Sequence, residues 1–445
     1  MRYSMDSAIM ENAFSFWRDY GGNIIPLEFT GPYDEYMATR TTASLGIFLS
    51  SSPIYDITGP DAEKFLNYVC VNRDFSKMKV GGSRHGLLCN ERGQLLGSGV
   101  VLKKADGFYR TYWLAPALQF FCEESDLNIQ GRYCTDEYFY QIDGPKSLEI
   151  LETATNTDLH DLKFGQHKDV MIEGTVMTVY RLGMSGALAY EMHGAAADAE
   201  TAYKRLRKVL FDFGGKLQGA RNYCAVNHTV AGYPNQYQHF WYPFFTSGEK
   251  LKAFAEKNFS CWCLYRGSAS DDLENFYVTP YDLGWGKLVN FDKEDFRGRE
   301  ALLAVSQKEP RKMVTLEWNA DDVADVFASQ FRGTDSVVYD QIEHYNGLTD
   351  AAQGGSMRGD YVLCDGKKIG VATGKTYAWM ERRMVSLASI DAEYAVEGKE
   401  LIVLWGTPGG PMKEIRTKVA PFPYYQGEFR NETFDVEKIP RLAQK

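Results

Sequence analysis

The sequence has no long apolar run: none of its segments approaches the about 20 apolar residues that a transmembrane helix needs. Its first residues, MRYSMDSAIMENAF, have no apolar core of the kind that a secretory signal peptide carries. Eight cysteines are scattered along 445 residues, and the one close pair, CWC at 261–263, has neither zinc-knuckle nor C-x-x-C spacing. These absences predict a cytoplasmic protein with reduced thiols and no membrane contact.

Positive charge and histidine are also scarce. The chain has 49 Lys and Arg against 59 Asp and Glu, a net charge of −10, which argues against a general nucleic-acid-binding surface. Its seven histidines include no H-x-x-x-H pair, so no metal site is predicted. The sequence also lacks a G-x-S-x-G elbow, so a serine hydrolase is not predicted. The segment GVATGKTYAW is not a phosphate loop, because the position that requires the first glycine is Ile369.

What the chain does contain is an internal repeat. IYDITGPDAEKFLN from residue 54 and FYQIDGPKSLEILE from residue 139 each read as a strand, a Gly-Pro pair and an amphipathic helix, at an offset of 85 residues. Because proline presets the backbone of a first helical turn, Pro60 and Pro145 mark the expected helix starts. The repeat predicts two halves related by a pseudo-dyad, with a ligand cleft between them.

The chain changes in character after residue 310. Five segments rich in β-branched residues are separated there by Gly, Asp and Pro turns, which is typical of an antiparallel β-barrel or sandwich. We therefore place a boundary near QKEPRK, 307–312. The predicted fold class is α+β: a region 1–306 of two intertwined α+β subdomains, with repeats near 54–67 and 139–152, and a β-barrel domain 307–445.

One carboxylate stands out in the segment RLGMSGALAYEMHG, 181–194. If its second part is a strand, Leu188, Tyr190 and Met192 share one face and Glu191 shares the other with two alanines. Glu191 is then either a solvated side chain or a ligand-binding group that accepts N–H donors from a flat ring held against the alanines. A helix predicted over 198–213 follows the strand, so Glu191 is expected to be rigidly held.

Two further segments each allow two interpretations. Residues 219–245 hold eight aromatic residues and no acid, so they either pack in a core or line a pocket for an aromatic ligand. Arg84 and His85 precede a hairpin-like turn at Glu91–Gly93 and are either solvated loop residues or the anchor of an anionic substrate.

The following segments occur along the chain in this order: the repeat, GMSGALAYEMHG, GARNY with a later AGY, YDLGWGKLVNFDKEDFRGREAL, and GVATG with RMVSLASID. With these segments the chain resembles the aminomethyltransferase (glycine-cleavage T-protein) superfamily, which binds tetrahydrofolate. VTLEWNADDVADVFASQF adds to the similarity to the branch of tetrahydrofolate-dependent aryl-methyl-ether O-demethylases that act on vanillate, syringate and similar compounds. The resemblance implies tetrahydrofolate as cofactor, a small methoxybenzoate-like substrate, a folate cleft between the two halves and no metal. It leaves the oligomeric state open.

The resemblance also implies roles for individual residues. Glu191 matches the glutamate that binds the pterin N–H groups, and Tyr223 matches the tyrosine proposed for catalysis in the demethylase branch. Tyr233 matches a folate-contacting tryptophan. Arg221 and Trp285 lie in segments that match the family and are expected to contact the cofactor.

Departures from the family pattern concern the substrate. Gly97 or Ser98 stands where glycine-cleavage enzymes carry an aspartate, which argues against an aminomethyl substrate. Ser52 lies in FLSSSP, where vanillate-type members have a Gln-Ser-His-His-like stretch, and Leu114 stands where they carry a carboxylate-binding arginine. Arg84, with His85 as the other candidate, is therefore expected to anchor a carboxylated substrate.

Three functions remain open on these grounds. The first is an aryl O-demethylase, which transfers a methyl group to N5 of tetrahydrofolate and needs an acid such as Tyr223 beside the leaving phenolate. The second is a folate-dependent S- or N-demethylase, whose sulfonium or methylamine substrate would pack on aromatic residues of 233–245. The third is a folate-binding regulator without catalysis.

Overall fold

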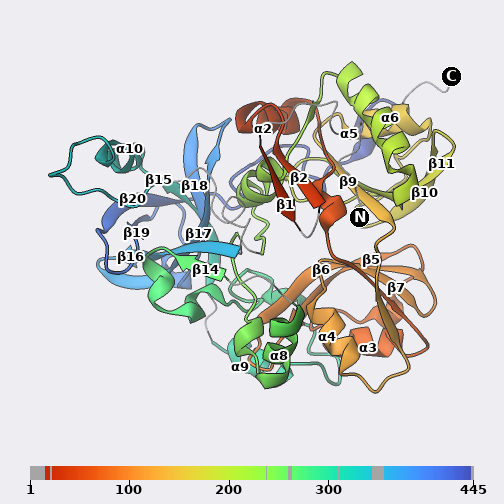
Figure 1. Cartoon of the computed structure of the whole chain (residues 1–445), viewed down its shortest axis with the longest axis horizontal. Coiled ribbons are helices and arrows are strands. Elements are labelled where there is room, and N and C mark those ends of the chain that lie inside the picture. Colours follow the sequence, from red (N-terminus) through yellow and green to blue (C-terminus); the bar gives the residue numbers. More distant parts are fainter. Residues whose placement is uncertain are drawn as a thin grey trace.

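The computed structural model of the chain describes residues 16–20, 23–236, 238–258, 263–308, 311–342 and 355–441. The N-terminal segment 1–14, Cys261 of the CWC pair, Tyr237 of the aromatic segment and residues 309–310 of the predicted boundary lie outside the described residues. Figure 1 shows three bodies around a common centre: the two halves of the first region, in orange and yellow, and a β-rich body in blue. In the described part of the chain, no helix combines the length and the apolar character that crossing a membrane needs.

The first half is a five-stranded sheet covered by helices. Its strand order is β5-β6-β7-β4-β8, with β4 (Ile54–Thr58), β5 (Ser83–Cys89), β6 (Leu95–Ala105), β7 (Phe108–Tyr112) and β8 (Gln130–Tyr133). Helices α3 (Ala62–Val69) and α4 (Ala117–Glu123) bury their apolar sides in one core with the sheet, in which Phe65, Leu87 and Leu118 are almost fully buried.

The second half repeats this arrangement with six strands. The order is β10-β11-β12-β9-β3-β13, with β3 (Ser44–Gly46), β9 (Glu137–Asp143), β10 (His167–Ile172), β11 (Thr175–Tyr180), β12 (Ala189–Ala195) and β13 (Lys216–Leu217). Helices α5 (Ser147–Thr155) and α6 (Ala199–Asp212) pack on it, and α6 occupies the range predicted as a helix. The buried side chains of α6 recur every three or four residues, which is why this segment forms a helix against a sheet.

The backbone confirms the duplication. Gly59 and Gly144 adopt nearly the same conformation, with φ of +128° and +129°, which residues with a side chain rarely adopt. In both halves a Cβ at this glycine would collide with a carbonyl oxygen, that of Asn128 at 2.4 Å and that of Thr42 at 2.5 Å. The helices begin at Ala62 and Ser147, two residues later than the prolines themselves, so each Gly-Pro pair forms the turn before the helix.

The β-rich body is a closed barrel of six antiparallel strands. These are β15 (Lys312–Trp318), β16 (Gly355–Cys364), β17 (Lys367–Ala378), β18 (Arg383–Ile390), β19 (Glu400–Trp405) and β20 (Lys413–Ala420). They pair in the order β16-β17-β18-β15-β20-β19, and β19 pairs with β16 to close the barrel. The five segments predicted as strands all lie in it, so the predicted fold class is confirmed.

Two segments cross the predicted boundary. Strand β14 (Cys263–Arg266), which precedes the boundary, joins the barrel by pairing in parallel with β16. In the other direction, Val436 and Ile439 are buried in the core of the second half. The ring of His160 holds this returning segment, because its Nε2 lies 3.0 Å from the carbonyl oxygen of Ile439. The division into 1–306 and 307–445 stays a prediction.

The remaining helices and strands lie outside the sheets of the three bodies. They are β1 (Phe16–Tyr20), β2 (Asn23–Glu28), α2 (Pro32–Thr41), α7 (His228–Val230), α8 (Glu249–Asn258), α9 (Arg299–Ser306) and α10 (Ala320–Ser329). Among them, α8 and α9 pack in the core of the first half, and α10 contacts β20 of the barrel. A π-helix, η4 (Arg221–Asn227), leads directly into α7. An apolar cluster between the two sheets includes Tyr112 from β7, Phe139 from β9 and Tyr223 from η4, so the π-helix packs where the halves meet.

Candidate functional site

Glu191 lies on β12 and is buried, with 7% of its surface exposed. Side chains alternate along a strand, and Leu188, Tyr190 and Met192 are buried in the helix-covered core of the second half. Glu191 and His193 therefore lie on the opposite face of the sheet. This burial excludes the interpretation of Glu191 as a solvated side chain.

The π-helix supplies the second part of the site. Tyr223 is 4% exposed, and its ring centroid lies 5.4 Å from that of Phe48 and 5.2 Å from that of His228. Burial, with the charges of Asp143 and Glu191 nearby, raises the pKa of Tyr223 well above its usual value. The hydroxyl therefore keeps its proton at neutral pH. π-Helices are rare and often occur at functional positions, but the sequence analysis did not predict this one.

Asp143, at the end of β9, belongs to the same site and was also missed. It is fully buried and accepts hydrogen bonds from Nε2 of Gln218 at 2.6 Å and Nε2 of Gln141 at 3.2 Å. Burial raises its pKa to about 7, against the opposing effect of hydrogen bonds from Ser185 and Gln218. Asp143 lies on β9 and Glu191 on the neighbouring strand β12, where Glu191 is paired with Gln141. The two acids therefore project from adjacent strands of one sheet.

Several buried polar atoms around these acids have no hydrogen-bond partner within the described residues: Gln141 Oε1, Asn222 Oδ1 and Asn227 Nδ2. They belong to β9 and the π-helix. Arg40 connects the π-helix to the segment before β12 by donating to Asn227 Oδ1 at 2.9 Å and to the Ser185 carbonyl at 2.6 Å. Buried polar groups are rarely left unpaired in folded proteins. Their grouping here fits a ligand with several donors and acceptors.

Arg221 and Tyr233 lie at the two ends of the segment that contains the π-helix. Arg221 donates through Nη1 to Glu28 Oε1 on β2 at 2.9 Å. The Tyr233 hydroxyl accepts a hydrogen bond from Arg430 Nη2 at 2.8 Å, and the Arg430 guanidinium lies 5.0 Å from the centre of the Tyr233 ring. Arg221 is therefore tied to β2, and Tyr233 to the segment that follows the barrel.

Trp285 and His85 form a separate cluster with the first half. Their ring centroids lie 5.3 Å apart, and His85 Nε2 lies 2.9 Å from Ser98 Oγ. Burial lowers the pKa of His85 to about 4, so this imidazole is neutral at pH 7 and supplies no charge to an anion.

Arg84, in contrast, is exposed. Both Arg84 and His85 lie on strand β5 rather than in a loop, which corrects the loop interpretation. The Arg84 guanidinium donates through Nη1 to the carbonyl oxygen of Ser83 at 2.6 Å. Of the two predicted anchors, only Arg84 carries a positive charge.

The other two predicted substrate residues are fully buried. Leu114 packs in the core of the first half, where a Cβ at Gly86 would lie 3.0 Å from its Cδ1. Ser52 follows the short helix η1 (Phe48–Ser51), whose Phe48 contacts Tyr223. The structure thus brings Glu191 and Tyr223 together with Asp143, which was not predicted, while contacts to a substrate at Arg84, Leu114 and Ser52 stay predictions.

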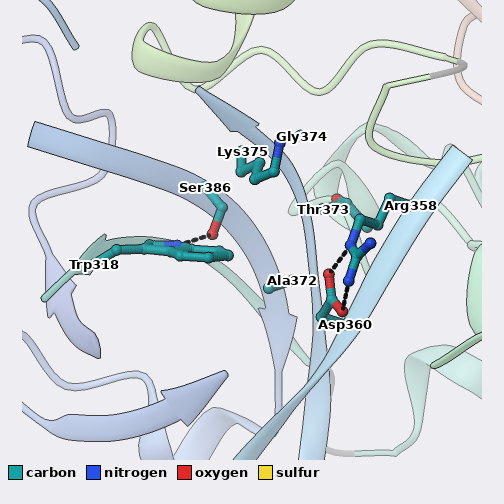
Figure 2. Close-up of a pocket in the computed structure, with 8 residues that line it drawn as sticks. All are labelled: Trp318, Arg358, Asp360, Ala372, Thr373, Gly374, Lys375 and Ser386. Atoms are coloured by element: carbon teal, nitrogen blue, oxygen red, sulfur yellow. Dashed lines mark hydrogen bonds and ion pairs between the residues drawn. The ribbon is translucent and has the colours of Figure 1, made fainter. Parts of the chain in front are cut away.

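A small cavity lies inside the barrel, away from these residues (Figure 2). Its volume is about 10 Å³, room for one water molecule. Arg358 donates to both oxygens of Asp360 at 2.9 and 3.1 Å, and Trp318 Nε1 donates to Ser386 Oγ at 3.0 Å, as Figure 2 shows. The Trp318–Ser386 pair links β15 to β18, whereas Arg358 and Asp360 both lie on β16. The cavity is too small for a folate or an aromatic substrate.

One cluster in the described part of the chain has the composition of a metal site: Glu152, Asp158 and His160. His160 Nδ1 lies 2.9 Å from Glu152 and 3.2 Å from Asp158, and its Nε2 contacts the Ile439 carbonyl. With acceptors at both ring nitrogens, the imidazole acts as a hydrogen-bond donor. The cluster therefore anchors the C-terminal segment.

Comparison with known proteins adds the following relationships. Residues 7–228 match the model of the GCVT N-terminal domain. The chain is 44% identical over 450 residues to a sesamin methylene transferase of Sinomonas sp. (strain No.22), with 98% of each chain covered. It is 30% identical to a syringate O-demethylase of Sphingobium sp. (strain NBRC 103272 / SYK-6), with 93% of this chain and 94% of the relative covered.

More distant relatives share the fold. An aminomethyltransferase of Listeria welshimeri is 26% identical, over 92% of this chain and 93% of its own length. The crystal structure of the glycine cleavage system aminomethyltransferase T from Bartonella henselae superposes with a TM-score of 0.67 at 19% identity, over 94% of this chain and 96% of that one. The similarity therefore extends over both halves and the barrel.

Proposed function

Because this chain belongs to the aminomethyltransferase (GCVT) family, within its tetrahydrofolate-dependent demethylase branch, we propose that it transfers a one-carbon group from an ether oxygen of a small aromatic compound to tetrahydrofolate. The family assigns the class of enzyme, a tetrahydrofolate-dependent methyltransferase. The observation that carries the proposal is the burial of Glu191 next to Tyr223 and to polar atoms that lack partners.

Tetrahydrofolate fits these groups. Its pterin ring presents an amino group and ring N–H groups on one edge, and a buried carboxylate is a strong acceptor for such paired donors. Gln141 Oε1 and Asn222 Oδ1 are further acceptors, and Asn227 Nδ2 is a donor for a carbonyl oxygen. Glu191, Asn222 and Asn227 would thus hold the cofactor, and its N5 supplies the amine that accepts the one-carbon group.

The residues of the chain then have distinct tasks. Glu191 orients the pterin, and such alignment of two reactants can lower a barrier by several kcal/mol, about 7–11 at best. Tyr223 stays protonated because of its raised pKa and donates a hydrogen bond to the ether oxygen as negative charge develops there. The apolar cluster that contains Phe48 and Phe139 keeps water away from the reacting atoms.

With a methyl ether the transfer is an in-line displacement. A bond forms between the amine nitrogen and the methyl carbon while the carbon–oxygen bond breaks, and its electron pair stays on the phenolate oxygen. The N–H proton of the amine ends on that oxygen, so the products are a phenol and 5-methyltetrahydrofolate. No net oxidation or reduction takes place.

A second candidate, transfer of a methylene group, is favoured by the sesamin methylene transferase at 44% identity. In a methylenedioxybenzene one carbon is bonded to two phenol oxygens. Both carbon–oxygen bonds break, the carbon binds N5 and N10, and the two N–H protons go to the oxygens. The products are a catechol and 5,10-methylenetetrahydrofolate, again without a redox change.

The alternatives are less well supported. A sulfonium or methylammonium substrate needs free aromatic faces, but the ring of Tyr233 is covered by the Arg430 guanidinium. A regulator without catalysis would have no need of Tyr223 beside the pterin-binding carboxylate.

The test is an incubation of the enzyme and tetrahydrofolate with methoxybenzoates, methoxyphenols, methylenedioxybenzenes and methylated sulfonium or ammonium compounds, with the folate products identified by mass spectrometry. 5-Methyltetrahydrofolate from the methoxy compounds supports the first candidate. 5,10-Methylenetetrahydrofolate from the methylenedioxy compounds supports the second. Transfer from the sulfonium or ammonium compounds alone, or from none of the panel, would overturn the proposal.

A further inference from the structure

A chain of charged side chains leads from the first half of the molecule to the second. Arg110 on β7 donates through Nε and Nη2 to the two oxygens of Asp56 on β4, at 2.8 and 2.9 Å. Its third nitrogen, Nη1, donates to Glu137 Oε2 on β9 of the other sheet. One guanidinium therefore bridges a carboxylate from each half.

His193 continues this chain to Glu191. Its Nδ1 lies 3.0 Å from Glu137 Oε1, and its Nε2 lies 3.5 Å from Glu191 Oε2, an ion-pair distance without hydrogen-bond geometry. A carboxylate oxygen thus faces each ring nitrogen, and an imidazolium carries a proton on both nitrogens, whereas a neutral imidazole carries only one. These surroundings favour the protonated ring.

The balance of charge points the same way. Glu137 and Glu191 are each 7% exposed and His193 is 3% exposed, so charges in this chain are poorly screened by water. With Asp56, the three carboxylates outnumber the two guanidinium groups of Arg110 and the exposed Arg132, which pairs with Asp56 at 3.7 Å, and a protonated His193 balances the remaining negative charge.

The pKa shifts are consistent with this balance. Burial disfavours the charged form of His193, but the hydrogen bond to Glu137 and the charges of Glu137 and Glu191 raise its pKa. The hydrogen bond and charge of His193, with those of Arg110 and Tyr112, lower the pKa of Glu137 to about 2 against the same burial.

The neighbouring strands leave this arrangement intact. The Tyr112 ring on β7 lies 4.8 Å from the His193 ring and donates its hydroxyl to Glu137 Oε1 at 2.7 Å, and the Phe139 ring on β9 lies at 4.2 Å. Burial lowers the pKa of His167 on β10 to about 4, so it adds no charge at pH 7. The titratable and charged groups near His193 are thus Arg110 and Tyr112 on β7, Glu137 on β9, His167 on β10, Tyr180 on β11 and Glu191 on β12.

We propose that His193 is a positioning residue, an inference that rests on the proposed binding of tetrahydrofolate. As an imidazolium held between Glu137 and Glu191, it keeps the Glu191 carboxylate charged and directed toward the pterin N–H groups. Arg110 and Glu137 extend this support into the first half. The role is specific to the sequence Y-E-M-H of β12, where His193 follows Glu191 on the same face.

The first test measures the dissociation constant of tetrahydrofolate by calorimetry from about pH 6 to pH 9.5, a range that spans the titration of a histidine with a raised pKa. In the wild type, affinity should fall as the pH rises and His193 loses its proton. His193→Gln should raise the dissociation constant about 10-fold at neutral pH and remove the alkaline decline. His167→Gln, the same substitution on a neighbouring strand, should keep the wild-type profile.

Two further measurements guard against a misfolded variant. Glu137→Gln keeps an acceptor oxygen but removes its charge, so it should move the alkaline decline to lower pH. In the cofactor-free wild type, nitrogen NMR of the imidazoles at about pH 6.5, the usual histidine pKa, should show His193 mainly doubly protonated. A mainly neutral His193 there, or a His193→Gln profile identical to wild type, would overturn the inference. A wild type that binds no tetrahydrofolate would instead overturn the proposed function.

Discussion

Arg110 and Glu191 occupy equivalent positions in the two halves. Arg110 lies opposite Asp56 in the pairing of β7 with β4, and Glu191 lies opposite Gln141 in the pairing of β12 with β9. Asp56 and Gln141 are separated by the 85 residues of the repeat. The first half thus has the Arg110–Asp56 ion pair at the position where the second half has Glu191 facing Gln141. In the first half this position stabilises the fold, and in the second half it provides the carboxylate proposed to bind the cofactor.

Glu191→Gln is expected to weaken tetrahydrofolate binding by about 1–3 kcal/mol, the cost of depriving buried donors of a charged acceptor. Calorimetry on the folded variant measures this. Glu152→Gln is the matched control, since Glu152 is also buried but contacts His160 on the far side of the helix-covered core. An unchanged affinity in Glu191→Gln would remove Glu191 from the cofactor site.

Tyr223→Phe should lower kcat for an aryl methyl ether by about 10²–10⁴-fold, the usual contribution of a positioned acid, and leave the affinity for tetrahydrofolate nearly unchanged. Tyr138→Phe serves as the control, because the buried Tyr138 hydroxyl has no hydrogen-bond partner within the described residues. If Tyr223→Phe keeps full activity, the leaving oxygen draws its hydrogen bond from elsewhere.

Arg84→Ala should raise KM for a carboxylated methoxy substrate and leave a methoxyphenol without that group almost unaffected, since a guanidinium binds a carboxylate through two parallel hydrogen bonds. Arg92→Ala, an exposed arginine beside the same hairpin that pairs with Glu274, should affect neither substrate. Equal losses for both substrates in Arg84→Ala would show that Arg84 acts on the fold or on the cofactor.

Asp143 should contribute a stabilisation of the cofactor-free protein that is lost as the pH rises from about 4 to about 7. This contribution is opposite in sign to that of His85 and His167, whose lowered pKa values make stability rise over the same range. The pKa of Asp143 is raised to about 7 from its ordinary 3.8, so the native state holds a proton that the unfolded chain has already lost. The resulting stabilisation is complete below the unfolded value and disappears as the pH passes the folded one. Glu35 is raised to about 7 in the same way.

Thermal unfolding across this pH range checks the sign. Asp143→Asn cannot lose that proton, so its unfolding temperature should rise relative to that of wild type as the pH increases from 4 to 7. A difference between variant and wild type that stays constant over this range would contradict the assignment of Asp143 as a largely protonated group.

Gly144→Ala should destabilise the protein by at least about 3 kcal/mol, because it combines a strained backbone with a collision against the Thr42 carbonyl oxygen. Gly174→Ala is the control: its φ of +82° is also strained for alanine, but nothing lies within 4 Å of the added Cβ, so about 1 kcal/mol is expected. Chemical denaturation compares the two. Equal losses would mean that the turn relaxes around Gly144.

Local sequence patterns predicted most of the framework. The five segments after residue 310 that are rich in β-branched residues were predicted as strands because each one either alternates apolar and polar residues or is continuously apolar between Gly, Asp and Pro turns. The Gly-Pro repeat identified the two halves. Strand β14 was missed, since four residues with a parallel partner nearly a hundred positions away leave no local signal. The π-helix was missed because its residues have ordinary helix propensities, and because its partners α2, β2 and β17 are distant in the sequence.

The site was predictable where one residue broke a local pattern. Glu191 was such a residue, a lone acid beside alanines in an alternating strand. His193 was available by the same reasoning, two positions further along the same face. Asp143, Glu137 and Arg110 were not predictable, because their partners are distant in the sequence. Arg110 meets Glu137 across two sheets, and Asp143 meets Gln218, 75 positions away.

The return of Val436 and Ile439 to the second half has a consequence for biosynthesis. His160 and the Ile439 carbonyl that it contacts are 279 positions apart in the chain. At a usual synthesis rate, a ribosome needs roughly 15–55 s to cover that distance. During this time the apolar core of the half that carries Glu191 lacks Val436 and Ile439, so that half completes its packing only after the barrel has been synthesised.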